Sequence, residues 1–174
     1  LNFDPEIADG LAKRGIGVTP TIQLYRDALD HLNERATLGT ISKEERKRLK
    51  QLPMVIEEKY RALQGFLSAG VQLVAGNDAG LPHTGFGCLW QELDAMMTGG
   101  MTAMGAIGAA TVVPAKSLRL DDHIGSILEG KQADLLVVDG DPIVDITALS
   151  RVSMVMQAGR VVTGKTGGSV PLNL

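Results

Sequence analysis

The stretch Val71–Gly80, VQLVAGNDAG, decides the fold class, because an apolar run stops there on a carboxylate flanked by glycines. Val71–Ala75 is a short continuous apolar strand, and such strands are typical of parallel sheets covered on both faces. Asp78 follows at the carboxyl end of this strand, where α/β folds place ligands and catalytic groups. The local sequence leaves a second interpretation open, since Asp in a glycine-rich loop also forms turns or caps helices.

The residues before this stretch predict an α/β rhythm with a helical segment in the middle. Asp4–Glu6 begins a helix, and Ile16–Thr21 is a short strand candidate. Two long helices are expected between residues 22 and 69, because apolar residues recur there at helical spacing. A capping box at Ser42–Glu45 opens the second helix, and Pro53 is a candidate interruption of it.

After this stretch the spacing changes from helical to strand-like. Helices are predicted from Leu89 onward, followed by a strand at Asp134–Asp139 and a hairpin over residues 152–163. These changes divide the chain into an α/β portion (1–120), a β portion (121–165) and a tail (166–174) that we expect to be poorly ordered.

Composition excludes several classes of function. The 174 residues are 44% hydrophobic and 21% charged, which is typical of a globular chain. A net charge of −3 and 3% aromatic residues argue against a nucleic-acid partner. No apolar run reaches the roughly 18 residues of a membrane span. The single cysteine, Cys88, cannot form an internal disulfide, so a reducing compartment, the cytoplasm by default, is expected.

Three blocks of sequence form an ordered series over residues 69–163. They are AGVQLVAGNDAG (69–80), LWQELDAMMTGGMTAMGAIGAATVVPAKSLRLDDHIGSILEGKQADLLVVDGDP (89–142) and VSMVMQAGRVV (152–162). This series resembles the C-terminal part of the amidohydrolase superfamily, above all its imidazolonepropionase-like and Xaa-Pro dipeptidase-like members. In that family a last barrel strand ends in Gly-Thr-Asp, and GSI-x-x-GK-x-ADLV precedes a closing V-x-x-GR-x-V.

The resemblance implies a (β/α)8 barrel with a small β-sandwich. This chain would hold the last strands and helices of the barrel within 1–120, with a helical insertion at about 22–69, and C-terminal sandwich strands within 121–165. Asp78 would match the aspartate that binds the metal and takes a proton from the attacking water, although Asn77 stands where Thr or Ser is usual. The implied cofactor is a divalent metal, zinc by preference.

Other side chains have weaker assignments. His83 lies near a family turn that contacts substrate, but Thr84 interrupts the match, so a solvent-exposed loop histidine is the alternative. His31 and His123 are predicted at the surface, and Cys88 in the core. Glu92 is interpreted as helix packing. The remaining candidates for core filling are Met96, Met97, Met101 and Met104.

The family's other metal ligands have no counterpart here, since the chain has three histidines and no His-x-His pair. The chain starts at Leu1, and we expect it to be the C-terminal part of a metal-dependent amidohydrolase that cleaves an amide-type C–N bond of a peptide or cyclic amide. By itself the chain would be inactive and without bound metal, and its partner would be the missing N-terminal barrel part. The segment at 22–69 would serve as a lid or as a dimer contact in a homo-oligomer. The alternative function is a non-catalytic structural or interaction module.

Overall fold

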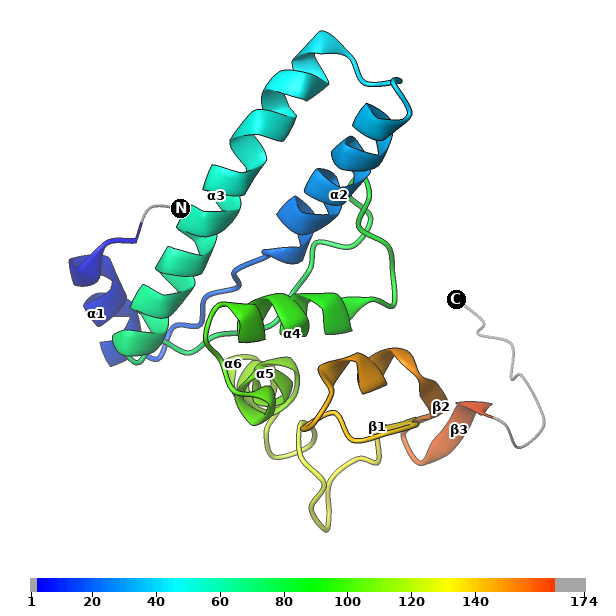
Figure 1. Ribbon diagram of the computed structural model, residues 1–174. Helices are drawn as coiled ribbons and strands as arrows, with labels where there is room; N and C mark the ends of the chain where they lie inside the picture. The colour runs from blue at the N-terminus through cyan, green and yellow to red at the C-terminus, as the bar shows by residue number, and fades with distance from the viewer. Residues whose placement is uncertain (1–2, 165–174) are drawn as a thin grey trace.

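The computed structural model describes residues 3–164. In chain order its elements are α1 (Pro5–Lys13), α2 (Gln23–Thr37), α3 (Lys43–Ser68), α4 (Leu89–Thr98), α5 (Ala103–Ala110), α6 (Val112–Ser117), β1 (Leu135–Val138), the 3-10 helix η1 (Ile146–Ser150), β2 (Val152–Gln157) and β3 (Arg160–Gly164). Figure 1 shows α2 and α3 side by side as an arm that rises from α4–α6, with the sheet next to η1. The predicted tail at 166–174 lies outside the described residues.

Side-chain caps hold the starts of three helices, and two of these caps, at Asp4 and Ser42, were predicted from the sequence. Asp4 Oδ1 accepts a hydrogen bond of 2.9 Å from the backbone N–H of Glu6 at the start of α1. Ser42 and Glu45 form the reciprocal capping box at the start of α3. The hydroxyl of Thr102 accepts from the N–H of the third residue of α5, at 3.1 Å. These caps satisfy N–H groups that have no partner within the helix.

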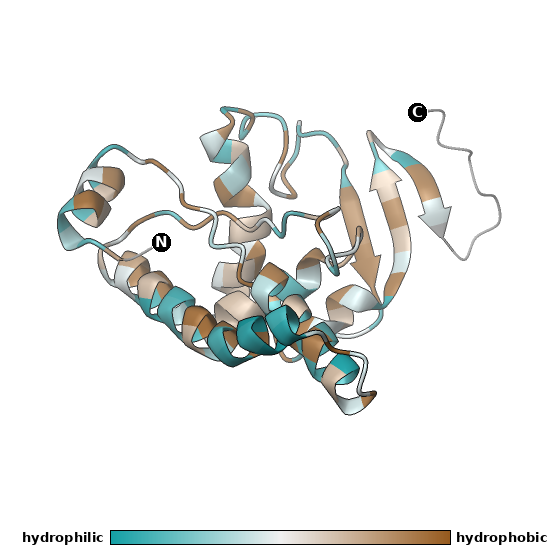
Figure 2. Ribbon diagram, turned by 90° about the horizontal axis from the view of Figure 1, so that it is seen from above, coloured by the Kyte–Doolittle hydropathy of each residue, from teal (hydrophilic) through white to brown (hydrophobic). Residues whose placement is uncertain are grey.

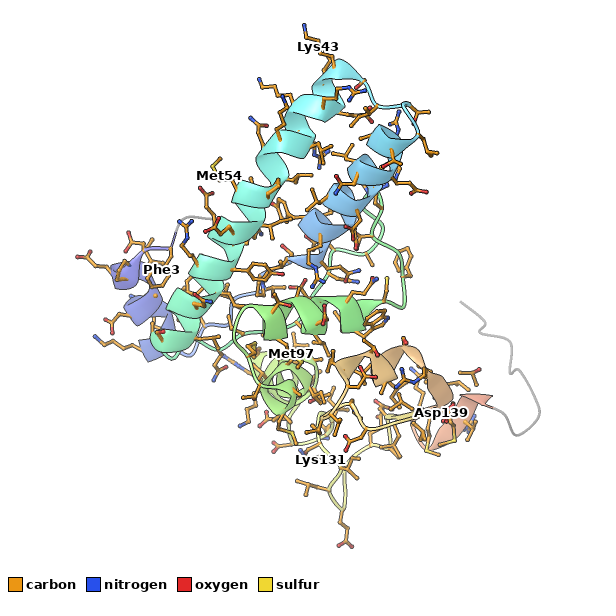
Figure 3. The ribbon with its side chains drawn as sticks, viewed as in Figure 1. Phe3, Lys43, Met54, Met97, Lys131 and Asp139 are labelled. Carbon is orange, nitrogen blue, oxygen red and sulfur yellow. The ribbon has the colours of Figure 1, made fainter. Side chains whose placement is uncertain are left out.

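The arm formed by α2 and α3 has a small hydrophobic core of its own. Its buried members are Ala28, Leu32, Ile41 and Leu52. The interruption expected at Pro53 is wrong, because α3 runs without a break through this residue. Leu52 and Ile56 are buried on either side of the exposed Pro53, so packing against α2 holds the helix together. Lys43 and Met54 project from α3 away from α2 (Figure 3).

A larger core joins α1, the second half of α3, α4 and α5. Met96 is fully buried in this core, and Met97 and Met101 pack against it, as predicted. Met104 does not fill the core, since its side chain is 64% exposed. The sequence of α5, AMGAIGAA, has no polar side, so its spacing could not indicate which face is buried.

The two predicted strands before α4 pair only briefly. Val18 and Leu73 form a single parallel bridge, with Val18 N–H donating to Gln72 O at 2.9 Å and Val74 N–H donating to Val18 O at 3.0 Å. The pairing is parallel, as an α/β arrangement requires, but it is shorter than the stretches 16–21 and 71–75. A two-stranded parallel pair is marginal without further strands beside it, which explains the short pairing within residues 3–164.

The β portion is a three-stranded antiparallel sheet in the order β1-β2-β3. The predicted hairpin is present as β2 and β3, and the predicted strand is β1. Asp134 fixes the hairpin, because its Oδ1 accepts a hydrogen bond of 2.7 Å from the N–H of Ala158 in the turn. Figure 2 shows that these strands are largely hydrophobic.

Among the helices of residues 3–164, none combines the length and the hydrophobicity that crossing a membrane would need.

Candidate functional site

Two chain segments end side by side near Asp78. Since Val18 and Leu73 are parallel partners, the residues that follow each of them leave the bridge in the same direction. The first segment turns at Thr21, with a φ of 50°, and the second turns at Asp78, with a φ of 52°. Non-glycine residues seldom adopt such angles. Asp78 is exposed, so its carboxylate is open to a ligand.

Backbone hydrogen bonds give the loop after Asp78 a defined shape. The N–H of Leu81 donates to Asp78 O at 3.2 Å, and the N–H of Thr84 donates to Leu81 O at 3.1 Å. A third bond, from the N–H of Gly80 to Thr84 O at 3.0 Å, closes the two turns on each other. Asp78 therefore stands at the first position of an ordered double turn.

Glu92 of α4 caps the start of α2 from across the fold. The N-cap of α2, Ile22, makes no side-chain capping bond of its own. The two carboxylate oxygens of Glu92 accept instead, from Ile22 N–H at 3.0 Å and from Gln23 N–H at 2.6 Å. Glu92 is fully buried, and burial raises its pKa to about 7, although these backbone N–H groups lower it.

Lys59 of α3 brings a cation to the same region. Its Nζ donates to Pro20 O at 2.8 Å and lies 4.4 Å from the centre of the Tyr25 ring. Burial lowers the pKa of Lys59, whereas the carboxylates of Glu92 and Asp78 raise it. A positive charge therefore lies close enough to influence both acidic side chains.

The interface between α2 and α4 continues in polar contacts beyond Glu92. Gln23 Nε2 donates to Gln91 Oε1 at 2.7 Å, and Arg26 pairs with Asp94 at 2.8 Å.

A cavity of about 100 Å³ lies beside Lys59, between α3 and residues 18–21. A wider hollow of about 500 Å³ lies against the sheet and is lined by neither Asp78 nor Lys59. Asp78 lines neither of these cavities, and we place the candidate site where the two parallel segments end.

Comparison with known proteins identifies the family. The sequence matches the Amidohydrolase family over residues 3–162. The chain belongs to the amidohydrolase family. An imidazolonepropionase from Picrophilus torridus is 26% identical to this amidohydrolase chain over 115 residues, which are 66% of this chain and 27% of the relative.

Two solved structures extend the likeness to the fold of this amidohydrolase chain. A Xaa-Pro dipeptidase with bound methionine in the active site is 33% identical, with a TM-score of 0.74, covering 92% of this chain and 38% of that one. A prolidase complexed with N-methylphosphonate-L-proline is 25% identical, with a TM-score of 0.72, covering 93% and 38%. This amidohydrolase chain thus spans less than two fifths of each of these three relatives.

The donor set of this amidohydrolase chain is incomplete for a catalytic metal. A catalytic zinc ion takes about three protein ligands and one open position. Within residues 3–164, no group of three or more His, Cys, Asp or Glu side chains could hold a metal ion. Asp78 fits as a single oxygen donor, since it is exposed at the end of the second parallel segment, and the other donors would have to come from elsewhere.

The three histidines and the cysteine of this amidohydrolase chain differ in how far their positions agree with the sequence predictions. His123 is exposed, as predicted. His31 is not a simple surface residue, because its ring stacks on the exposed His83 with 3.7 Å between the ring centroids. The core position predicted for Cys88 is also wrong. This residue is half-buried just before α4, and its thiol donates to Gly85 O at 2.8 Å.

The sequence prediction placed Glu92 in helix packing and did not consider Lys59. Glu92 is packed, but as a buried carboxylate that caps another helix. A usable signal was present, since Glu92 lies four residues before the buried Met96, and Lys59 lies four residues before the buried Leu63. Opposite charges on the apolar faces of two helices predict that the helices meet there.

Proposed function

We propose that this chain supplies the C-terminal part of the active site of a metal-dependent amidohydrolase that hydrolyses an amide-type C–N bond. The observation that carries the proposal is the family match over residues 3–162, together with Asp78 at the end of the second of two parallel segments. The remaining ligands would come from the N-terminal part of the barrel, which would also close the barrel and the β-sandwich around residues 121–165.

Asp78 has two tasks in this proposal. Its exposed carboxylate is one of the metal's ligands, and it accepts the proton of the attacking water. The divalent metal, zinc by preference, would supply Lewis acidity and lower the pKa of bound water. The ordered double turn that follows Asp78 holds the backbone from which the carboxylate projects, and Lys59 contributes a positive charge nearby.

The substrate class we propose is a small peptide or cyclic amide. This proposal is supported by two similar structures, a Xaa-Pro dipeptidase with methionine bound in its active site and a prolidase complexed with N-methylphosphonate-L-proline. His83 lies five residues after Asp78 on the exposed loop, so substrate contact through the free face of its ring is part of the proposal. We further propose a cytoplasmic location, consistent with the single, unpaired cysteine.

The test is hydrolysis by the complete protein that contains this chain. It would be assayed on a panel of Xaa-Pro dipeptides, other dipeptides and cyclic amides, before and after chelation and after addition of Zn²⁺, Mn²⁺ or Co²⁺. We expect turnover on at least one amide, lost on chelation and restored by a metal. Correctly folded, metal-loaded protein that cleaves no amide bond would contradict the proposal and favour a structural or interaction module.

A further inference from the structure

The loop that begins at Asp78 touches the arm at two places on one face of α2. The His83 ring stacks on His31, with 3.7 Å between the centroids and 18° between the ring planes. Thr84, which is only 3% exposed, lies near Asp27, although its hydroxyl makes no hydrogen bond to any of the described residues. Asp27 and His31 are four residues apart on a helix, so they form one continuous surface for the loop tip.

The backbone at His83 is held in a conformation that a histidine seldom adopts. Pro82 and His83 occupy the central positions of the turn closed by the bond from Thr84 N–H to Leu81 O. His83 has a φ of 74°, so the turn has the form of type II, in which Gly or Asn is usual at this position. The left-handed region strains a residue that has a side chain, and contacts of that side chain must offset the strain. The ring stack on His31 is such a contact.

The surroundings of His83 favour the neutral form of its ring. Burial lowers the pKa of His83, and His31 of α2, Arg48 of α3 and Arg35 of α2 lower it further, whereas Asp27 raises it. A neutral imidazole can stack closely on a second ring without electrostatic repulsion, as offset aromatic pairs do. The stack is therefore compatible with its surroundings near neutral pH.

We propose that His31 is a positioning residue, which acts by stacking on His83 and so docks the loop 78–88, with Asp78 at its start, on the α2–α3 arm. The arm then serves the site as a support for this loop. The docking itself needs neither metal nor substrate. Only the expected effect on kcat, which would come from a better positioned Asp78, rests on the proposed function.

Hydrogen exchange in the complete protein tests the docking without any assay of activity. The reporters are the amides of Gly80, Leu81 and Thr84, which donate the three bonds of the double turn. We expect His31→Ala to speed their exchange about threefold to tenfold, as the loss of an aromatic contact implies. His31→Phe, which keeps a flat ring, should restore slow exchange.

Two further variants make the result decisive. His83→Asn keeps a residue that tolerates positive φ but removes the ring, so it should speed exchange as His31→Ala does. This change is confined to an exposed side chain and decides the matter if His31→Ala does not fold. His123→Ala, at the exposed third histidine, is the control and should leave the loop unchanged.

Unchanged exchange at these amides in both His31→Ala and His83→Asn would overturn the proposal. Kinetics provide a second readout where the complete protein is active. A positioning role predicts that kcat falls in His31→Ala and recovers in His31→Phe, whereas a merely structural role lowers Tm without changing loop exchange. Absence of amidohydrolase activity would count against the proposed function and leave the exchange result intact.

Discussion

At the scale of single residues, Glu92 is the least expected feature of the molecule. A carboxylate with no exposed surface is costly unless donors surround it. Here the donors are two backbone N–H groups at the start of α2, 69 and 70 residues away in sequence. Glu92 thus ties the segment that ends at Thr21 to α4, the helix that follows the loop after Asp78.

Substitution of Glu92 should therefore lower the free energy of unfolding more than substitution of another acidic residue of α4. Glu92→Gln replaces one acceptor oxygen by a donor group and leaves one buried N–H unpaired, which we expect to cost about 1–3 kcal/mol of unfolding free energy. The matched control is Asp94→Asn on the same helix, whose half-exposed ion pair with Arg26 should contribute less than about 1 kcal/mol. Urea unfolding at pH 7 measures both. Equal losses in the two variants would contradict the capping role.

The same side chain predicts a pH dependence. Burial raises the pKa of Glu92 from 4.5 to about 7, so between these values the folded state holds a proton that the unfolded state has released. The stability linked to this proton is fully present below pH 4.5 and is lost as the pH rises through about 7. The stability advantage of wild type over Glu92→Gln should therefore narrow from pH 5 to pH 8. An advantage that widens with pH would show that the folded pKa is lowered instead.

How far residues could be predicted depended on whether their signal was local. Asp78 stands out because glycines and an apolar run surround it, and the caps at Asp4 and Ser42 follow from neighbours within three residues. The partners of Glu92 and the stacking of His31 on His83 are distant in sequence. No local spacing encodes such contacts, and they arise only when the arm folds against α4 and against the loop 78–88.

At the scale of elements, the close approach of α3 to the end of α4 depends on a glycine. A Cβ added at Gly99 would overlap the Leu63 side chain and meet Tyr60 Cδ1 at 3.1 Å, while its φ of −79° suits any residue. We expect Gly99→Ala to cost about 1–3 kcal/mol through overpacking alone.

The control for this substitution lies in the next helix. A Cβ at Gly108 of α5 meets nothing within 4 Å, so Gly108→Ala should be neutral or stabilise the fold by about 0.5–1 kcal/mol through helix propensity. Thermal unfolding of both variants compares the two effects. If Gly108→Ala destabilises the fold as much as Gly99→Ala does, the cost at Gly99 does not come from its close approach to Leu63 and Tyr60.

The arm can be tested as an element because its core is separate from the main one. Replacing residues 30–55 of the complete protein by a short glycine-rich turn removes His31 and most of the arm core. If the arm supports the loop after Asp78, kcat/KM should fall by about tenfold or more, as misplacement near a reacting centre implies. Circular dichroism and thermal unfolding check that the rest of the fold is retained. Unchanged kcat and KM would exclude a role of the arm in the site.

Elements with strong periodicity were predicted well, whereas elements that depend on pairing with neighbouring strands were not. The arm helices, β1 and the hairpin of β2 and β3 follow from spacing and turn residues. The strands at 16–21 and 71–75 are reduced to one bridge between Val18 and Leu73, because a parallel pair gains its length from strands on both sides. The predicted break at Pro53 was wrong, because packing of α3 on α2 outweighs the loss of one helix hydrogen bond.

At the scale of the whole molecule, the fold presents parts of a site. Parallel segments carry Thr21 and Asp78 away from one bridge in the same direction, Lys59 places a charge nearby, and the arm supports the loop that follows. The family assignment explains why these parts converge, since the chain spans only 38% of the dipeptidase with which it shares 92% of its own length. Sequence could single out Asp78 as a candidate ligand, and its role stays a prediction, because a metal centre built from several segments is defined only when all of them are present.

The most direct test of this account is the metal content and turnover of the complete protein with Asp78→Asn. We predict loss of bound metal and a fall in kcat/KM of about a hundredfold to ten-thousandfold, since the side chain would no longer act as ligand or proton acceptor. Asp9→Asn, at an exposed carboxylate paired with Lys13, is the control and should change neither. Full metal occupancy and wild-type turnover in Asp78→Asn would contradict the account.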